Sequence, residues 1–366
     1  MEEKDLRLIE PAPQIHHRDS TARIMWTVVL CLVPAGIWGV YVFGTRVLAV
    51  LGVSVLSAVA AEYGMTRLLG KENTIQDGSA FLTGLLIGYN LPPSIPYYIP
   101  VMASLFAILI VKWTFGGLGQ NWMNPALAGR VFVFFSWTGH MTNWKMPATM
   151  DAADTVSGAS VLGFLKTGLL DYTGSETGPM AFLRNSGYPQ SSMDMRVTEW
   201  FRGIFGEGVP GGYWDLFVGN IPGCIGEISA LLLLAGAAVL LYKKIITWEI
   251  PTAYIVSFSV FIWIFGGLRF NAGFFNGNIL FHLLSGGLML GVFFMATDMV
   301  TSPLNRKGML IYGVGAGFLT FLIRIYGSFP EGVSLAIILM NIFVPMIDRY
   351  TQEKRFGIAK EKGQAA

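Results

Sequence analysis

Long apolar runs dominate this sequence and constrain its fold more than any other feature. A helix needs roughly 17–25 apolar residues to cross a bilayer, and eight runs are of that order. Two shorter runs, 78–90 and 125–140, are interrupted by Gly and Pro. Only 13% of the residues are charged, against roughly 25% in soluble domains. The sequence therefore predicts an all-α polytopic membrane protein with about ten transmembrane helices. The long runs cover 24–43, 47–66, 97–113, 224–242, 251–268, 279–297, 308–326 and 332–348.

The distribution of positive charge predicts how these helices are oriented. Lys and Arg collect on the cytoplasmic side of short loops. With the N-terminus inside, seventeen of them, Lys112 and Arg130 included, fall on the cytoplasmic side, and three fall on the other side. We therefore expect both termini to be cytoplasmic and the polar segment 141–222 to be an extracytoplasmic loop.

Five runs precede that loop and five follow it, so the second half enters the membrane from the opposite side. This predicts two inverted five-helix repeats. Two proline-containing stretches, 84–96 and 296–305, are interpreted either as broken helices at a central site or as ordinary helix ends. The expected divisions are a cytoplasmic tail 1–23, a first repeat 24–140, the loop 141–222, a second repeat 223–348 and a cytoplasmic tail 349–366.

Several classes of partner and cofactor are excluded by composition. Basic residues form no cluster or helix face, so we expect no nucleic acid partner. Cys31 and Cys224 stand singly within apolar runs and no CxxC pair exists. The chain alone therefore predicts no iron–sulfur cluster and no metal site, and both thiols are expected to be buried.

One short polar motif within the loop carries chemistry. The stretch 154–160 reads DTVSGAS, with an acid at Asp154, hydroxyls at Ser157 and Ser160, and almost no side-chain bulk at Gly158 and Ala159. An enzyme could grip such a turn and join one of its oxygens to a phosphate. The alternative is a polar loop turn built of small residues.

The pattern D-x-x-S-G-A-S resembles the recognition motif of the transferase that links FMN to proteins through a phosphoester. The rest of the chain resembles the NqrB/RnfD family, the membrane subunits of the sodium-pumping NADH:quinone oxidoreductase and of the Rnf ferredoxin:NAD oxidoreductase. NqrB-type chains usually have a longer cytoplasmic N-terminus than the tail 1–23 of this sequence, and this difference favours the RnfD type. The resemblance runs through 12–44, 77–98, 115–130, DTVSGAS and 295–303.

This resemblance implies a flavoprotein subunit that is active only within a complex and has no catalytic residue of its own. FMN would be esterified to Ser160, a position usually occupied by threonine in the family, and a second, non-covalent flavin, riboflavin, is also implied. Electrons would pass between ferredoxin and NAD, coupled to Na⁺ or H⁺ translocation across a bacterial or archaeal cell membrane. Implied partners are the lipid bilayer, an RnfG-like flavin subunit, iron–sulfur subunits and an NAD-binding subunit.

A few polar residues in or near the spans are candidates for further contacts. Asp298 and Thr301 together form an oxygen-rich contact for a cation or flavin. Asn124 either contacts a flavin edge or caps the helix that begins at Pro125. Arg324 either meets an anion such as a flavin phosphate or pairs with a carboxylate. Glu62 is expected to pair with Arg67 at the inner end of their helix.

Two other functions remain open on sequence grounds. Inverted five-span repeats with broken helices also describe solute channels, such as those for urea and ammonium. A scaffold subunit that has lost its flavin is the third possibility. The DTVSGAS motif separates these functions, because a channel has no use for a transferase recognition site.

Overall fold

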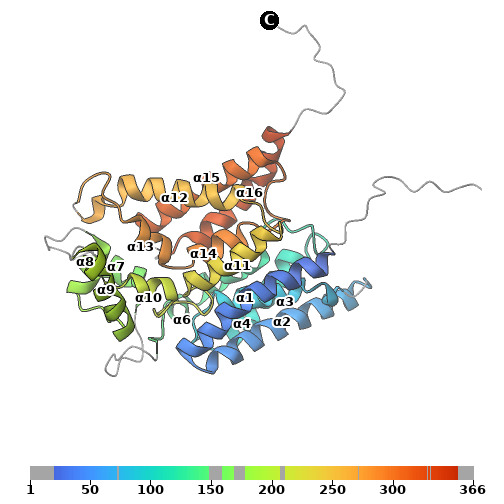
Figure 1. The fold of residues 1–366 in the computed structure, drawn as a ribbon. Helices are drawn as coiled ribbons and strands as arrows, with labels where there is room; N and C mark the ends of the chain where they lie inside the picture. The colour runs from blue at the N-terminus through green and yellow to red at the C-terminus, as the bar shows by residue number, and fades with distance from the viewer. Residues whose placement is uncertain are drawn as a thin grey trace, which may run out of the picture.

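Roughly parallel and antiparallel helices form the body of the molecule, and shorter helices cover one of its ends (Figure 1). The computed structural model describes residues 20–71, 74–147, 159–168, 178–206, 211–270, 272–327, 329 and 331–352. The elements of the first half are α1 (Thr21–Phe43), α2 (Arg46–Leu68), η1 (Ile75–Asp77), α3 (Ser79–Tyr89), α4 (Tyr98–Leu105), its π-helical continuation η2 (Phe106–Lys112), α5 (Pro125–Ser136) and α6 (Thr138–Met141).

The loop segment contains α7 (Val161–Gly168), α8 (Pro179–Asn185), α9 (Ser192–Phe205) and α10 (Tyr213–Val218). The second half contains α11 (Ala230–Tyr242), α12 (Glu249–Phe265), η3 (Leu268–Phe270), α13 (Ile279–Leu284), α14 (Leu288–Leu290), its π-helical continuation η4 (Gly291–Met295), α15 (Arg306–Ile325) and α16 (Val333–Thr351). Each of the ten predicted apolar runs thus contains a helix, which confirms an all-α polytopic membrane protein.

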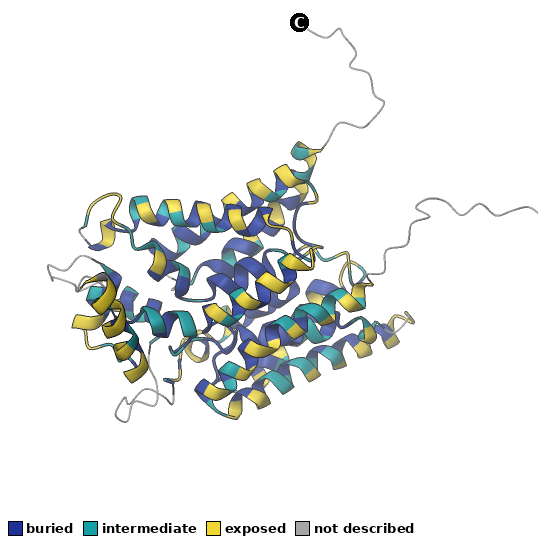
Figure 2. Ribbon diagram, viewed as in Figure 1, coloured by how far each residue is buried: buried dark blue, intermediate teal, exposed yellow. Residues whose placement is uncertain are grey.

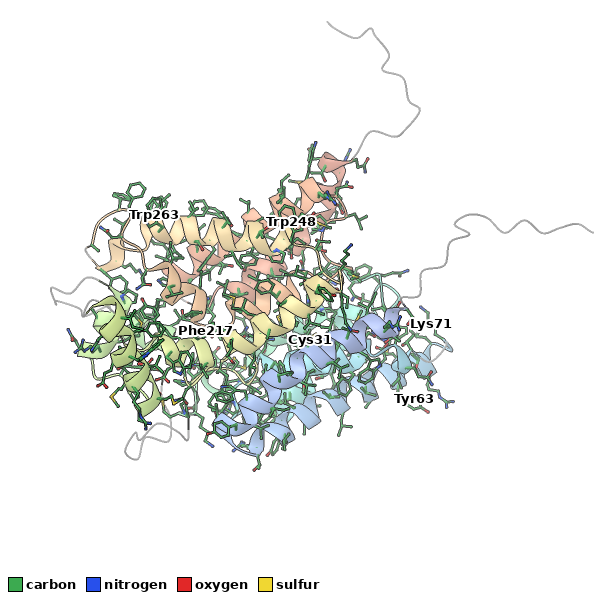
Figure 3. The ribbon with its side chains drawn as sticks, in the orientation of Figure 1. Cys31, Tyr63, Lys71, Phe217, Trp248 and Trp263 are labelled. Carbon is green, nitrogen blue, oxygen red and sulfur yellow. The ribbon has the colours of Figure 1, made fainter. Side chains whose placement is uncertain are left out.

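Within the described residues, five helices are long and apolar enough to cross a membrane: α1, α2, the stretch Glu249–Phe270, α15 and α16. Their outward faces expose large apolar side chains such as Leu30, Leu56 and Val256 (Figure 2). Exposure of so much apolar surface to water is unfavourable, whereas lipid tails are as apolar as these side chains and can cover them. The exposed Trp248 and Trp263 lie at opposite ends of α12 (Figure 3), where indole rings suit the two membrane interfaces.

Glycine lets α12 and α15 approach each other closely. A Cβ atom at Gly313 would lie 2.8 Å from the carbonyl oxygen of Ile250, and one at Gly317 would lie 2.6 Å from that of Tyr254. Only a residue without a side chain fits at either position. Small residues at helix contacts are the usual basis of packing within membranes, where burial from water supplies no driving force.

The bundle has two chemically different ends. The basic end carries Lys71, the start of α1 and the end of α16, and here Arg306 Nε pairs with Glu249 Oε1 at 3.3 Å. The loop end is covered by α7–α10. Tyr213 of α10 accepts a 2.6 Å hydrogen bond from Asn278, the residue that caps α13, so the loop helices are joined to the bundle.

Two apolar runs are interrupted within the bundle. Helix α3 ends at Tyr89 and the chain turns at Asn90, as the proline-containing stretch 84–96 predicts. In the second half the break lies at Ser285–Gly287, between α13 and α14, where Gly286 adopts a φ of 69°. A left-handed backbone at that point favours glycine. The stretch 296–305 instead connects η4 to α15 at the basic end, so of its two interpretations the ordinary helix end is the one that the structure has.

Candidate functional site

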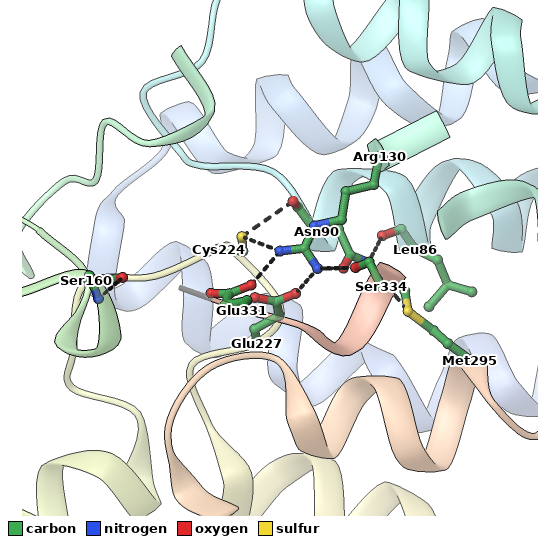
Figure 4. Close-up of polar contacts among 10 residues, drawn as sticks. Leu86, Asn90, Arg130, Ser160, Cys224, Glu227, Met295, Glu331 and Ser334 are labelled. Atoms are coloured by element: carbon green, nitrogen blue, oxygen red, sulfur yellow. Dashed lines mark hydrogen bonds and ion pairs between the residues drawn. The ribbon is translucent and has the colours of Figure 1, made fainter. Parts of the chain in front are cut away.

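Four segments that are distant in the sequence bring polar side chains together inside the bundle. They are the end of α3 with Asn90, the middle of α5 with Arg130, the turn before α11 with Glu227, and the turn before α16 with Glu331 (Figure 4). The turn before α11 is fixed to the end of α3 and the turn after it by two backbone hydrogen bonds, Gly226 N to Tyr89 O at 3.0 Å and Ile225 N to Leu91 O at 3.1 Å. We call Asn90, Arg130, Cys224, Glu227, Glu331 and Ser334 the central cluster.

Arg130 is the hub of the central cluster. Its Nη1 donates to Asn90 Oδ1 at 2.8 Å and to Ser334 Oγ at 2.7 Å. Its Nη2 donates to Glu331 Oε2 at 2.6 Å and to Cys224 Sγ at 3.7 Å. A guanidinium is well suited to this role because its rigid fork supplies several donors at once. The two halves of the bundle are therefore joined through one side chain.

Glu227 is held differently from Glu331. Its Oε1 lies 2.9 Å from Arg130 Nη1, yet neither carboxylate oxygen receives a hydrogen bond from any described residue. Its side chain is only 3% exposed. Donor atoms of Cys224, Glu227 and Glu331 lie within 4.8 Å of one another, as in a metal site, but the Arg130 guanidinium already contacts all three.

Ser160, the last residue of the DTVSGAS motif, lies next to this cluster. It is buried, and its Oγ accepts a 3.1 Å hydrogen bond from Gly163 N at the start of α7. A cavity of about 10 Å³ is lined by Ser160, Glu227, Gly286 and Glu331, among others. The motif and the central cluster are therefore neighbours, which sequence reasoning did not foresee.

Of the other motif residues, only Ala159 is described; Asp154, Ser157 and Gly158 lie outside the described residues. The carbonyl of Ala159 accepts a 3.5 Å hydrogen bond from the hydroxyl of Tyr188. Burial, together with the negative charge of Asp215, raises the pKa of Tyr188. The hydroxyl thus stays protonated and remains a donor that fixes the end of the motif.

Arg324 lies buried near the loop end of α15. Its Nη1 donates to the carbonyl oxygen of His282, and its guanidinium lies 5.2 Å from the ring centre of Phe258. Its Nε and Nη2 have no hydrogen-bond partner in the described part of the chain. Lys166 and Arg269 line the same cavity of about 20 Å³. Of the two roles considered for Arg324, contact with an anion fits these unused donors better than a carboxylate pair.

A larger cavity, of about 110 Å³, opens at the basic end and is lined by Asn124 and Asp298. Asn124 Oδ1 accepts from Ala126 N at 3.0 Å and from Leu127 N at 3.2 Å, so it caps α5. Its Nδ2 also donates to Met295 O at 3.2 Å. Asp298 Oδ2 accepts from Thr301 Oγ1 at 3.0 Å. Asp298 and Thr301, the two candidate oxygen ligands for a cation, are therefore in contact, but they lie at the basic end of the bundle and not at its centre.

Glu62 does not pair with Arg67, so that prediction was wrong. Its carboxylate accepts from Lys112 Nζ at 2.8 Å, from Trp113 Nε1 at 2.8 Å and from Thr74 Oγ1 at 2.7 Å. Residues five apart project about 140° apart around a helix. Glu62 therefore faces inward, while Arg67 is exposed.

Sequence reasoning missed the central cluster because Arg130 was assigned to the cytoplasmic loops. It lies buried in α5 instead, and Lys112 is buried as well, so neither belongs in the positive charge count of the loops. The signals that could have found the cluster are CIGE at 224–227 and PEG at 330–332, each placing a carboxylate beside glycine at the start of an apolar helix. Intramembrane charge is expensive and marks a functional site by default.

Comparison with known proteins covers nearly the whole chain. The model of the NQR2, RnfD, RnfE family matches residues 8–357. The D subunit of the Na⁺-translocating ferredoxin:NAD⁺ oxidoreductase complex of Acetobacterium woodii is 42% identical over 98% of this chain and 97% of its own length. The D subunit of the proton-translocating ferredoxin:NAD⁺ oxidoreductase complex of Clostridium ljungdahlii is 41% identical over 97% of both chains. The D subunit of the ion-translocating oxidoreductase complex of Stutzerimonas stutzeri is 37% identical over 93% of both.

Proposed function

The chain belongs to the NQR2, RnfD, RnfE family, and from this premise we propose that it is the flavin-carrying RnfD subunit of an Rnf-type electron transport complex. It works within a multi-subunit, ion-translocating oxidoreductase and not alone. In that complex it carries FMN on Ser160 and passes electrons between ferredoxin and NAD, coupled to movement of Na⁺ or H⁺. Both termini face the cytoplasm and 141–222 faces outward.

The observation that carries the proposal is the position of Ser160. As the residue that caps α7, it lies where backbone N–H groups and the helix dipole favour an anion. The unpartnered Nη2 of Arg324 lies 3.3 Å from the point where a Cβ of Gly286 would stand, and Gly286 lines the Ser160 cavity. These features fit the phosphate end of FMN.

The isoalloxazine ring does not fit the same cavity, whose volume is about 10 Å³. It would therefore lie outside the cavity, against the loop helices or a partner subunit. Bound there, FMN supplies one- and two-electron transfer, while the protein supplies position and electrostatics. An RnfG-like flavin subunit, iron–sulfur subunits and an NAD-binding subunit are the proposed partners.

For the second flavin, riboflavin, we propose the larger cavity at the basic end. It is mostly apolar and presents a few polar groups, Asn124 and Asp298 among them, as cofactor pockets usually do. The proposed ion contact of Asp298 and Thr301 lies in the same region. A solute channel is the weaker alternative, because Arg130 and its two carboxylates fill the centre of the bundle where a channel needs an open path.

The test is in-gel flavin fluorescence of the complex under denaturing conditions, after co-expression with the flavin transferase. We expect a fluorescent band that is lost in Ser160→Ala and kept in Ser160→Thr, which retains the attachment oxygen. Ser186→Ala, an exposed serine of the loop segment, is the matched control and keeps the band. A wild-type chain whose intact mass shows no added FMN would overturn the proposal.

A further inference from the structure

The central cluster holds more negative than positive charge in direct contact. Glu227 and Glu331 both lie within ion-pair distance of Arg130, at 2.9 and 2.6 Å, and no other cation pairs with either in the described part of the chain. We propose that Glu227 is the binding site for one exchangeable monovalent cation, a proton or Na⁺. This inference rests on the proposed function only in assigning that cation to the translocated ion.

Hydrogen-bond geometry distinguishes the two carboxylates. The Nη1 atom of Arg130 has two hydrogens, which are directed to Asn90 and Ser334, and the two on Nη2 are directed to Glu331 and Cys224. No terminal hydrogen is left for Glu227, although its oxygen is close. Glu331 is therefore the fixed counter-ion of Arg130. Glu227 is a buried carboxylate that is attracted to Arg130 but accepts no hydrogen bond from it, and the nearest other donor is the weak thiol of Cys224. Such burial is costly unless a cation joins the carboxylate.

The other charged or ionisable groups that face Glu227 do not replace that cation. Cys224 Sγ donates to the carbonyl of Asn90 at 3.3 Å. Arg324 lies across Gly286 with its Nη1 on the carbonyl of His282 and its Nη2 on the side of Glu331, but it forms no ion pair with either carboxylate in the described part of the chain. On the remaining side, a Cβ at Gly287 would lie 2.4 Å from the carboxyl carbon of Glu227, so bare backbone covers the carboxylate there.

The Ser160 cavity leaves space for the cation directly beside Glu227. Its volume of about 10 Å³ is at the lower limit for holding one water molecule, and Glu227 and Ser160 both line it. In the proton form, a hydronium ion from the solvent gives its proton to one oxygen of Glu227 and leaves as neutral water, and release is the reverse step. In the sodium form, the ion takes the same oxygens as ligands, and no covalent bond changes.

The test is labelling with dicyclohexylcarbodiimide, which reacts with protonated carboxyl groups in apolar surroundings. The purified complex is labelled between about pH 5 and about pH 8, and the modified peptide is identified by mass spectrometry. We expect label on Glu227 that increases as the pH falls. Insensitivity to Na⁺ identifies the cation as a proton, and protection by Na⁺ but not K⁺ at constant pH identifies it as sodium.

Two variants test whether the charge balance among Arg130, Glu227 and Glu331 determines the labelling of Glu227. In Glu331→Gln, Arg130 is left to neutralise Glu227 alone, so labelling of Glu227 falls by at least about tenfold, the effect of roughly 1.4 kcal/mol of added charge stabilisation. Glu249→Gln, at the basic end, removes another buried carboxylate and leaves the labelling unchanged. Unlabelled Glu227 throughout the pH range, or label independent of both pH and Na⁺, overturns the proposal.

This readout requires neither bound flavin nor turnover. If Ser160→Ala kept its fluorescent band while Glu227 labelled as expected, the flavin proposal would fail and the cation site would stand. If the band behaved as expected and Glu227 stayed unlabelled, the cation site would fail and the flavin proposal would stand.

Discussion

Arg130 Nη2 and Glu331 Oε2 lie 2.6 Å apart, in side chains that are about nine-tenths buried and separated by 201 residues. This contact ties α5 to the start of α16 and so joins the two halves of the bundle. Glu227 lies against the same Arg130 guanidinium, but its carboxylate forms no hydrogen bond with the described residues. The arrangement links the stability of the fold to the charge state of the central cluster.

Removing the hub should destabilise the protein strongly. Arg130→Gln leaves two buried carboxylates without their counter-ion, and loss of one partner of a buried pair typically costs about 3–5 kcal/mol. We expect a large fall in the melting temperature of the detergent-solubilised complex. The exposed Arg67→Gln is the control and should change it little. The double variant Arg130→Gln/Glu331→Gln should lose less than the sum of its two single variants; simple additivity would contradict the coupling.

The positions of the helices could be predicted from the sequence because the bilayer imposes a length and an apolar composition on every span. The central cluster could not, because its charges are compensated by residues far away in the chain. Arg130, taken alone, has the pattern of a loop charge; only the approach of Glu227 and Glu331 allows it to lie inside the bundle.

Contacts between distant segments also explain why two other features could not be predicted: the neighbours of the DTVSGAS motif and the position of the helix break in the second half. DTVSGAS singles out Ser160 by local pattern, yet nothing local shows that Glu227 lines the same cavity. Proline in 296–305 is compatible with a broken helix or an ordinary helix end, and it proves to mark a helix end; the break lies at Ser285–Gly287, where Gly286 has a left-handed φ of 69°. Glycines are so frequent in this chain, 44 of 366 residues, that no single one signals a break.

Packing around the turn before α11 provides a second prediction. A Cβ at Gly226 would lie 2.2 Å from the ring of Tyr89, so Gly226→Ala must displace either the ring or the turn that carries Glu227. Overpacking of this kind costs about 1–3 kcal/mol. Gly52→Ala, at a position in α2 with nothing within 4 Å, should instead stabilise by up to about 1 kcal/mol. Thermal unfolding of both variants checks the contrast; equal effects would show that the contact with Tyr89 is not constraining.

Lys166 in the loop segment should make stability depend on pH. Its Nζ donates to the carbonyls of Arg324 and Phe329, at 3.2 and 2.5 Å, near the end of α15. Burial, with repulsion from Arg269 and Arg324, lowers the pKa of Lys166 from 10.5 to about 8. Between these two values the unfolded chain holds more protons than the folded one, so this group adds stability as the pH rises from about 8 to about 10.5.

Comparison with variants that do not titrate in this range isolates the effect of Lys166. The wild type should gain stability over both Lys166→Met and Lys166→Arg across this pH range, by no more than about 1 kcal/mol because the group is half exposed to solvent. Scanning fluorimetry at a series of pH values measures the difference. A difference that stays flat, or that favours the variants as the pH rises, would contradict the lowered pKa.

Two substitutions of Asn124 separate its role as the cap of α5 from its role as a hydrogen-bond bridge to Met295. Asn124→Asp keeps an acceptor for Ala126 N and Leu127 N but loses the donor to Met295 O. Asn124→Ala loses both and should cost about 1–2 kcal/mol in stability, the larger part from the cap. We expect Asn124→Asp to unfold close to the wild-type temperature while its riboflavin content, measured after acid extraction, falls. Unchanged riboflavin in both variants would leave Asn124 a cap and bridge only.

The position of Ser160 beside Glu227 predicts that negative charge on the one favours cation binding by the other. A phosphoester on Ser160 places negative charge in the cavity that Glu227 lines, so loss of that charge in Ser160→Ala should move carbodiimide labelling of Glu227 to lower pH. Ser160→Asp restores a negative charge without flavin and, since aspartate also caps helices well, should bring the labelling back toward that of the wild type. If all three proteins labelled alike at every pH, the attachment site and the cation site would be electrostatically independent, and flavin charge could not drive cation uptake at Glu227.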